Sequence, residues 1–238
     1  MVFSIPRQHL FPDPALAEPN GLLGVGGDLD PNRLILAYRQ GIFPWYSHAP
    51  ILWWSPNPRM VLHSADLHVR RSLAKRIRQA RFTITLDRAF DTVIERCASR
   101  PRPGQTGTWI TPQMMAAYRH LHALGYAHSC EAWQDGTLVG GLYGVAIGKV
   151  YSGESMFTDV PDASKVAFVH FVRQLHRWKY PLIDCQVYTE HLANFGAGEM
   201  PRHLYLEKLH DLQRLEGRQG PWTFDSDFDP LAPLTEEG

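Results

Sequence analysis

Apolar residues recur with helical spacing in several stretches of the chain, and each stretch carries residues that begin or end a helix. Asp30-Pro31 precedes one such stretch and Gly41 follows it, which is typical of a helix with an acidic N-cap and a proline in its first turn. The same signals predict five further helices. The first covers residues 69–81, and the second is capped by Asp87 and carries Phe90, Val93, Ile94 and Cys97. The third runs from Thr111 to before Gly125, the fourth is capped by Asp162 or Ser164, and the fifth covers about 202 to 215.

The pattern changes to that of strands at Cys130. An Asp135-Gly136 pair, typical of a tight hairpin turn, separates two apolar runs, and a second tight turn leads to a third run. We expect these segments to be antiparallel neighbours. Another strand is predicted over residues 182–188, where Asp184 and Gln186 fall on one face because side chains alternate along a strand. Together these elements predict an α+β fold with a mixed, largely antiparallel sheet flanked by helices.

Residues 1–63 differ in character from the rest of the chain. They contain one predicted helix followed by aromatic residues interspersed with prolines, and prolines at this spacing fit extended or turning backbone. We therefore predict a small, loop-rich N-terminal domain over residues 1–63. A larger domain is predicted over residues 64–238, ending in an acidic tail from Asp225.

The composition is that of an ordinary globular protein. The chain has 238 residues, of which 44% are hydrophobic and 20% are charged, with 24 Lys and Arg against 24 Asp and Glu. A chain of this length buries a sizeable core, which excludes a disordered or fibrous protein. The zero net charge argues against binding of nucleic acid through bulk charge, so any contact with nucleic acid has to be local.

Residues 66–102 depart from this neutrality. They hold ten Lys and Arg against four Asp and Glu, a net charge of +6. The helix predicted over residues 69–81 lies in this stretch and is both basic and amphipathic. Two interpretations of it remain open: a solvated face whose charge the acidic tail balances, or a surface that contacts phosphate groups.

The sequence shows no targeting or metal-binding signal. It begins without the basic and apolar regions of a secretory signal, and no apolar run approaches the roughly 18 residues of a membrane span. The three cysteines, Cys97, Cys130 and Cys185, have neither the spacing of a zinc site nor that of a disulfide framework. We expect reduced thiols in the cytoplasm, no association with membranes and no metal. Serine hydrolases and P-loop NTPases find no support, because their motifs do not occur.

Two short motifs carry side chains suited to catalysis. Glu154 follows a glycine after the predicted hairpin, and Gln186 stands two residues after Asp184. A glycine beside an acid lets a substrate backbone come close to a carboxylate. Acids at strand ends are also ordinary surface positions, so the spacing alone leaves both interpretations open.

Longer motifs in both predicted domains resemble those of one protein family. In the first domain they are Glu18-Pro19-Asn20-Gly21-Leu22-Leu23, Ala37-Tyr38-Arg39-Gln40-Gly41-Ile42-Phe43-Pro44-Trp45 and Ile51-Leu52-Trp53-Trp54-Ser55-Pro56. In the second they are Thr108-Trp109-Ile110-Thr111, Gly140-Gly141-Leu142-Tyr143-Gly144, Gly153-Glu154-Ser155-Met156-Phe157 and Asp184-Cys185-Gln186. In this order they closely resemble the leucyl/phenylalanyl-tRNA–protein transferase family, over roughly residues 10–215.

The resemblance implies a cytoplasmic aminoacyltransferase that works without a cofactor. Such an enzyme moves leucine or phenylalanine, and less readily methionine, from aminoacyl-tRNA to the N-terminal Arg or Lys of a protein. The product is marked for degradation through the N-end rule pathway. The resemblance also implies that the second domain has an N-acetyltransferase-like fold, and we expect a monomer. The best match to the acetyl-CoA loop of that fold, residues 193–198, has alanine at its first position, which agrees with a different acyl donor.

The resemblance also implies roles for individual residues. Asp184 polarises Gln186, whose carbonyl oxygen draws a proton from the attacking amine, and Glu154 lies near the N-terminal residue of the acceptor. The donor side chain is expected to contact Leu142, Tyr151, Phe168, Phe171 and Ile183, and the terminal adenosine of the tRNA to contact Tyr38, Trp45, Trp109 and Tyr118. Lys75 and Arg76 of the basic helix are expected to contact phosphates of the acceptor stem.

Three alternatives remain open from the residues themselves. The expected pocket residues have the periodicity of ordinary core positions, as does Tyr118. An acetyltransferase that uses acetyl-CoA would bind that cofactor despite the missing loop. A tRNA-binding module without catalysis would bind tRNA but form no peptide bond.

Overall fold

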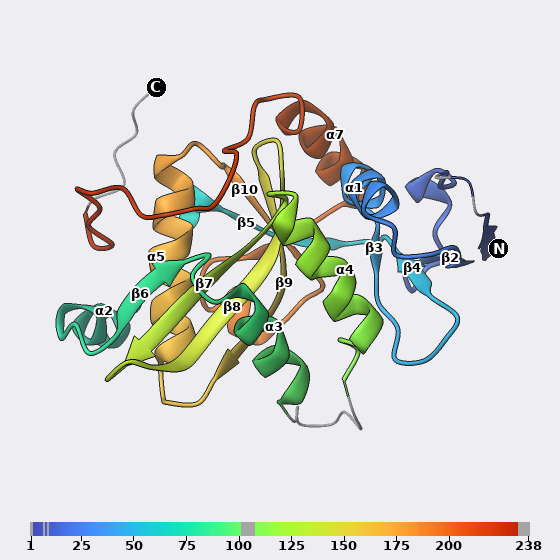
Figure 1. Cartoon of the computed structure of the whole chain (residues 1–238). Coiled ribbons are helices and arrows are strands. Elements are labelled where there is room, and N and C mark those ends of the chain that lie inside the picture. The colour runs from blue at the N-terminus through green and yellow to red at the C-terminus, as the bar shows by residue number, and fades with distance from the viewer. Residues whose placement is uncertain (1, 7, 9, 101–107, 233–238) are drawn as a thin grey trace.

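In the computed structural model, which describes residues 2–6, 8, 10–100 and 108–232, seven strands form one mixed sheet in the order β11-β5-β10-β9-β8-β7-β6 (Figure 1). Strands β9 and β10 run parallel, and every other neighbouring pair is antiparallel. The strands are β5 (Arg59–His63), β6 (Thr83–Leu86), β7 (Ala127–Gln134), β8 (Thr137–Ile147), β9 (Val150–Thr158), β10 (Leu182–Gln186) and β11 (Gly198–Met200).

Helices cover both faces of this sheet because each has one apolar side to bury. Helix α5 (Ala163–Arg177) packs on β7, β8 and β9 from one side. Helices α3 (Phe90–Ser99) and α4 (Pro112–Ala123) lie on the other side, as Figure 1 shows. The remaining helical elements are α2 (Arg71–Arg78), α6 (Glu190–Ala193), α7 (Arg202–Leu212) and the short 3-10 turns Pro14–Leu16 and Ser64–Asp66.

A smaller sheet and helix α1 (Pro31–Arg39) form the N-terminal part. The side chain of Asp30 accepts a hydrogen bond from the Asn32 N–H at 2.9 Å, which caps α1 as the sequence predicts. Helix α1 packs against β8 and α4, so the N-terminal part is joined to the larger sheet through apolar contacts. The strands of the small sheet, in their spatial order, are β1 (Phe3–Ile5), β2 (Leu22–Gly26), β4 (Leu52–Trp54) and β3 (Phe43–Pro44).

The predicted α+β fold, a small N-terminal part beside a larger domain with a mixed, largely antiparallel sheet, is confirmed. The division at residue 63 stays a prediction. Strand β5 lies on the N-terminal side of that division, yet it pairs with β10 and β11 of the larger sheet. Its side chains from Arg59 to Leu62 are buried, because the strand lies inside the sheet.

Most helices begin and end close to the residues that the sequence predicts. Thr111 caps α4 by accepting a hydrogen bond from the Met114 N–H, and α4 ends before Gly125. Helix α2 is shorter than residues 69–81 but buries Leu73 and Ile77 as expected. Cys97 is fully buried, as the helical spacing predicts.

The predicted N-cap Asp87 is wrong, and Asp162, one of the two residues predicted to cap α5, stands at the N-cap position without a side-chain hydrogen bond to the helix. Asp87 does not cap α3: it has a φ of +53° and its carboxylate accepts from the backbone N–H groups of Ser129 (2.8 Å) and Trp222 (2.7 Å), in addition to contacting His128. Asp162 precedes α5 with a φ of +71° and turns its carboxylate to Lys165 instead of a helix N–H. In both cases a left-handed backbone aims the side chain away from the first helical turn.

The chain beyond α7 crosses back to the C-terminal end of α5 (Figure 1). Asp225 accepts from the side chains of Gln174 and Trp178, and Arg177 pairs with Asp227 at 2.7 Å. The described part of the acidic tail is therefore attached to α5; its last acids, Glu236 and Glu237, lie outside the described residues, as does most of the predicted loop over residues 100–107. None of the described helices is long and apolar enough to cross a membrane.

Candidate active site

Strand β10 carries two of the predicted site residues and is irregular where they stand. Its register against β5 shifts between Asp184 and Gln186, which is a β-bulge, and Gln186 has a φ of +63°. A regular strand would place both side chains on one face, as the sequence predicts. The bulge separates their directions, so the two side chains reach different partners.

Asp184 is fully buried and forms an ion pair with Arg59, which is also buried. The guanidinium donates through Nε to Oδ1 at 2.7 Å and through Nη2 to Oδ2 at 2.6 Å, a bidentate geometry. The Tyr205 hydroxyl and the backbone N–H of Gln186 donate to the same carboxylate, both at 2.9 Å. The charge of Asp184 is thus balanced inside the protein.

The sequence interpretation missed Arg59. Its guanidinium lies between the rings of Phe43 and Tyr205, 4.9 and 4.6 Å from their centroids. One signal could have revealed it: Arg59 directly precedes the apolar run Met60-Val61-Leu62, and a charge at the start of a buried strand requires a partner. The sequence does not identify that partner, because Asp184 lies 125 positions further along.

Glu154, on β9, is the second buried acid of the site and is surrounded by neutral hydrogen-bond donors. Its carboxylate accepts from the Tyr38 hydroxyl at 2.7 Å, from the Tyr118 hydroxyl at 3.0 Å and from the side-chain amide of Gln186 at 2.7 Å. Burial raises the pKa of Glu154 to about 7, even though the three donors act to lower it. Such a carboxyl group can both take up and release a proton near neutral pH.

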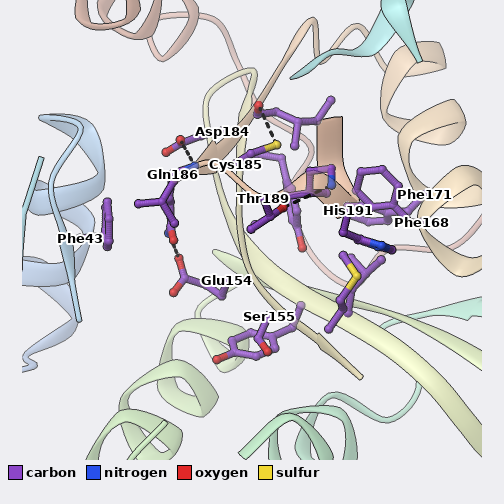
Figure 2. Close-up of a pocket in the computed structure, with 18 of the residues that line it drawn as sticks. Phe43, Glu154, Ser155, Phe168, Phe171, Asp184, Cys185, Gln186, Thr189 and His191 are labelled. Carbon is purple, nitrogen blue, oxygen red and sulfur yellow. Dashed lines mark hydrogen bonds between the residues drawn. The ribbon is translucent and has the colours of Figure 1, made fainter. Parts of the chain in front are cut away.

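The side-chain amide of Gln186 is therefore oriented by Glu154, while Asp184 holds its backbone N–H (Figure 2). Because the NH₂ group donates to Glu154, the amide oxygen of Gln186 remains as an acceptor on the other branch of the side chain. The expected link from Asp184 to Gln186 thus runs through the backbone.

A cavity of about 360 Å³ opens beside these groups, a size typical of small-molecule sites. Figure 2 shows Phe168 and Phe171 on one side, Phe43 on the other, and Glu154 and Gln186 between them. The cavity is apolar at the end formed by α5 and polar where Glu154 and Gln186 stand. Its lining includes every residue expected to contact the donor side chain: Leu142, Tyr151, Phe168, Phe171 and Ile183.

Several further apolar residues line the cavity that the sequence interpretation did not select. Three of them lie on strands or helices that also carry expected residues, and two lie on β3 and α6. They are apolar like core residues, so no local signal separates a pocket wall from a core position. They include Phe43, Met156, Val172, Cys185 and Leu192.

Trp45 and Trp109, which are expected to contact the terminal adenosine, also line the cavity. Trp45 is 38% exposed and packs against Trp54, with the two ring centroids 5.7 Å apart. The Trp54 indole donates to the backbone oxygen of Trp45 at 2.7 Å, which fixes the proline-rich loop at the cavity. An accessible indole on a fixed loop suits stacking on a nucleobase.

The four remaining predicted residues do not line the cavity. Tyr38 and Tyr118 are buried behind Glu154, where their hydroxyls contact each other and the carboxylate. Lys75 and Arg76 are exposed on α2, which packs against α5 at the end of the molecule opposite the small sheet (Figure 1). Arg76 lies 3.7 Å from the carboxylate of Asp162.

The described residues contain no cluster of three or more His, Cys, Asp or Glu side chains arranged to hold a metal ion. What they place together is an apolar cavity that ends on Gln186 and on Glu154, whose pKa burial raises to about 7. Such an arrangement has room for an apolar group and can exchange a proton beside it.

Comparison with known proteins identifies the family. The chain belongs to the leucyl/phenylalanyl-tRNA protein transferase family, whose model matches residues 61–210, while the model of that family's N-terminal domain matches residues 27–57. Leucyl/phenylalanyl-tRNA–protein transferase of Anaeromyxobacter sp. (strain Fw109-5) is 58% identical over 94% of this chain and 96% of its own length. The protein of the same name from Thiobacillus denitrificans is 57% identical over 89% and 93% of the two chains. This protein is thus a transferase.

Among solved structures, L-PGS from Bacillus licheniformis aligns with a TM-score of 0.39 and 12% identity, over 72% of this chain and 57% of that one.

Proposed function

We propose that this protein transfers leucine or phenylalanine from aminoacyl-tRNA to the N-terminal Arg or Lys of acceptor proteins, and methionine less readily. The observation that carries the proposal is the cavity with an apolar end and the Glu154–Gln186 pair beside it, in a chain of this family. Transfer would mark the acceptor for degradation by the N-end rule pathway. We place the reaction in the cytoplasm, where aminoacyl-tRNA is made, and propose that the enzyme acts as a monomer without a cofactor.

The donor side chain would occupy the apolar end of the cavity. Leucine and phenylalanine bury their apolar surface against Leu142, Phe168 and Phe171, which favours them over polar side chains. An apolar wall discriminates between similar side chains by only about 1–3 kcal/mol per methylene. We therefore expect slower transfer of methionine, but not its exclusion.

The reaction is aminolysis of an ester. The nitrogen of the acceptor attacks the carbonyl carbon of the donor, an N–C bond forms, and the bond from that carbon to the 3′ oxygen of the tRNA ribose breaks. An α-ammonium group has a pKa of about 7.7–8.0 and has to lose one proton before it attacks. The nitrogen loses a second proton as the amide forms, and the ribose oxygen takes one up.

Glu154 and Gln186 are placed to handle these protons. We propose that the amide oxygen of Gln186 accepts a hydrogen bond from the attacking amine and that Glu154 is the base. Asp184 is held in a bidentate ion pair with Arg59, so its role is to hold the bulge and the backbone of Gln186 in place. Before it takes up the proton, Glu154 is negatively charged, which also suits an acceptor that begins with Arg or Lys.

Trp45 and Trp109 would bind the terminal adenosine of the tRNA by stacking, which does not depend on the sequence of the tRNA. Tyr38 and Tyr118, which were expected beside them, would contribute through Glu154 instead, since their hydroxyls already contact that carboxylate.

One assay tests the proposed function. Purified protein is mixed with labelled Phe-tRNA or Leu-tRNA and with matched acceptor proteins that begin with Arg, Lys or Ala. Label is expected in the first two acceptors and not in the third. A parallel reaction with labelled acetyl-CoA tests for an acetyltransferase. If the protein binds tRNA but no acceptor becomes labelled, it is a tRNA-binding module without catalysis.

Removing one donor to Glu154 should change the pH dependence of transfer. The Tyr38 hydroxyl lowers the pKa of Glu154, so Tyr38→Phe should raise it and move the midpoint of the rate profile to higher pH. Single-turnover rates measured over a pH series provide the check. Tyr46→Phe is the control, because Tyr46 is another buried tyrosine of the N-terminal part and does not line the cavity. An unchanged midpoint in Tyr38→Phe would contradict the role of Glu154 as the base.

The basic helix yields a separate prediction. If Lys75 and Arg76 contact phosphates, replacing both with Gln should weaken tRNA binding and lower the slope of log K against log salt by about 1–2. The slope is measured by titrating tRNA at several salt concentrations. A slope equal to that of the unmodified protein would assign α2 to a solvated face.

A further inference from the structure

The C-terminal segment after α7 contains one tryptophan, Trp222, that is completely buried. It belongs to the stretch that ends in the acidic tail and lies beyond residue 210, where the match to the family model stops. Surface segments at the end of a chain rarely bury a large ring without a reason in the packing. The neighbours of Trp222 supply that reason.

The indole is fixed from one side by residues of the larger sheet. Its ring stacks on His128 with centroids 3.6 Å apart and an interplanar angle of 5°. Its backbone N–H donates to the carboxylate of Asp87 at 2.7 Å, and the same carboxylate contacts His128. The other ring nitrogen of His128 lies 3.1 Å from the backbone oxygen of Gly125. The surface beneath Trp222 is therefore fixed by hydrogen bonds at both ends of the imidazole.

The indole also contacts two rings of the cavity wall. The ring of Phe171 lies 6.0 Å from that of Trp222 at an angle of 29°, and the ring of Tyr151 lies at 6.4 Å. Phe171 and Tyr151 also pack on each other, with centroids 4.6 Å apart, and both line the cavity. Trp222 is absent from the lining itself, so it forms a second layer behind these two rings.

The following residues attach the segment to α5. Asp225 accepts from the Gln174 amide at 2.8 Å and from the Trp178 indole at 3.0 Å, and Arg177 pairs with both Asp225 and Asp227. Helix α5 is the element that carries Phe168 and Phe171. The acidic tail thus holds Trp222 against the same helix that forms the pocket wall.

We propose that Trp222 is a positioning residue that sets the size of the donor pocket, and so the preference between leucine and phenylalanine, by supporting Tyr151 and Phe171 from behind. This inference rests on the proposed function, because it concerns which aminoacyl group the cavity accepts. Aromatic rings in a packed core keep their positions only when the layer behind them is filled. A smaller residue at 222 leaves a gap into which the two rings can move, and the pocket becomes larger.

The test compares two donors in Trp222→Leu and Trp222→Phe. The kcat/KM is measured for Leu-tRNA and for Phe-tRNA with an acceptor that begins with Arg, and the ratio of the two values is the readout. Trp222→Leu should favour the larger side chain and raise the Phe-to-Leu ratio by about tenfold, the lower end of the discrimination that one methylene gives. Trp222→Phe retains an aromatic ring and should stay close to the ratio of the unmodified protein.

Trp133→Leu is the matched control. It removes the same side chain from β7, where Trp133 packs in a different apolar cluster and does not line the cavity. Loss of folded protein lowers both rates by the same factor, so the control should keep the ratio even if it lowers activity. A Trp222→Leu ratio equal to that of the control would overturn the inference.

A failure of the proposed function gives a different result. In that case the unmodified protein transfers neither amino acid, and the pocket is tested by calorimetry with L-leucinamide and L-phenylalaninamide. The inference again expects the Kd ratio to shift toward phenylalaninamide in Trp222→Leu. An unchanged ratio, or no binding of either amide to the unmodified protein, would overturn it.

Discussion

Replacing Arg59 with methionine is expected to lower the free energy of unfolding by about 3–5 kcal/mol, the usual cost of leaving one partner of a buried ion pair alone. Arg59 and Asp184 are both almost completely buried, and their two hydrogen bonds measure 2.7 and 2.6 Å. Without the guanidinium, Asp184 would be a buried charge with only neutral donors, Tyr205, Ser152 and the Gln186 N–H. Urea denaturation followed by circular dichroism measures the change.

Transfer should fall in the same variant, since the bulge that aims Gln186 is held by Asp184. The double variant Arg59→Met with Asp184→Leu is the control. It removes both charges together and should recover much of the stability, because an apolar pair of similar volume can replace a buried ion pair. It should not recover transfer. A loss below about 1 kcal/mol in Arg59→Met, the range of exposed ion pairs, would contradict a buried pair.

Replacing Glu154 with glutamine is expected to reduce the single-turnover rate by about 10²–10⁴, the usual contribution of a positioned base. Burial raises the pKa of Glu154 to about 7, so in the unmodified protein the rate should rise with pH through that value. In Glu154→Gln the remaining rate should follow only the ionisation of the acceptor amine, at a pH of about 8. Rates measured from pH 5.5 to 9 distinguish the two profiles.

The same pKa predicts how stability depends on pH. The pKa of Glu154 is raised from 4.5 to about 7 in the folded protein. Between pH 4.5 and 7 the folded state therefore holds a proton that the unfolded state releases. This contribution to stability is complete below about pH 4.5 and is lost as the pH rises through 7. The decline should be smaller in Glu154→Gln, as measured by urea denaturation at several pH values.

Glu131→Gln is the matched control for the pH profile of transfer. Burial also raises the pKa of Glu131, which accepts hydrogen bonds from Ser129 and Thr85 and does not line the cavity. This variant should change stability but leave the pH profile of transfer as it is. If Glu154→Gln keeps the original single-turnover rate and pH profile, another group accepts the proton from the attacking amine.

The sequence predicts best those features that depend on nearby residues. Helix α1 begins at its aspartate and proline because both act within one turn. Asp87 looked equally suitable as a cap, but its carboxylate is used by Trp222, 135 positions away, and no local pattern reveals such a partner. The hairpin strands followed from turn residues and alternation, whereas the bulge in β10 depends on pairing with β5, more than 100 residues earlier.

The site shows the same division. All the residues expected to contact the donor side chain line the cavity, and that expectation came from the resemblance to the family, since their spacing alone is that of core positions. Arg59 was missed, and Tyr38 and Tyr118 lie behind Glu154 instead of at a site for the adenine ring of the tRNA. The positions of these three residues depend on contacts between the N-terminal part and the larger sheet.

Those contacts also determine the stage of protein synthesis at which the candidate active site can form. Tyr38 and Arg59 come from the first 63 residues, yet they meet Glu154 and Asp184, which lie 116 and 125 positions later. A growing chain folds from its N-terminus and cannot close these contacts until the later strands have been made. Under the proposed function, an unfinished copy of this enzyme therefore does not consume the aminoacyl-tRNA on which its own translation depends.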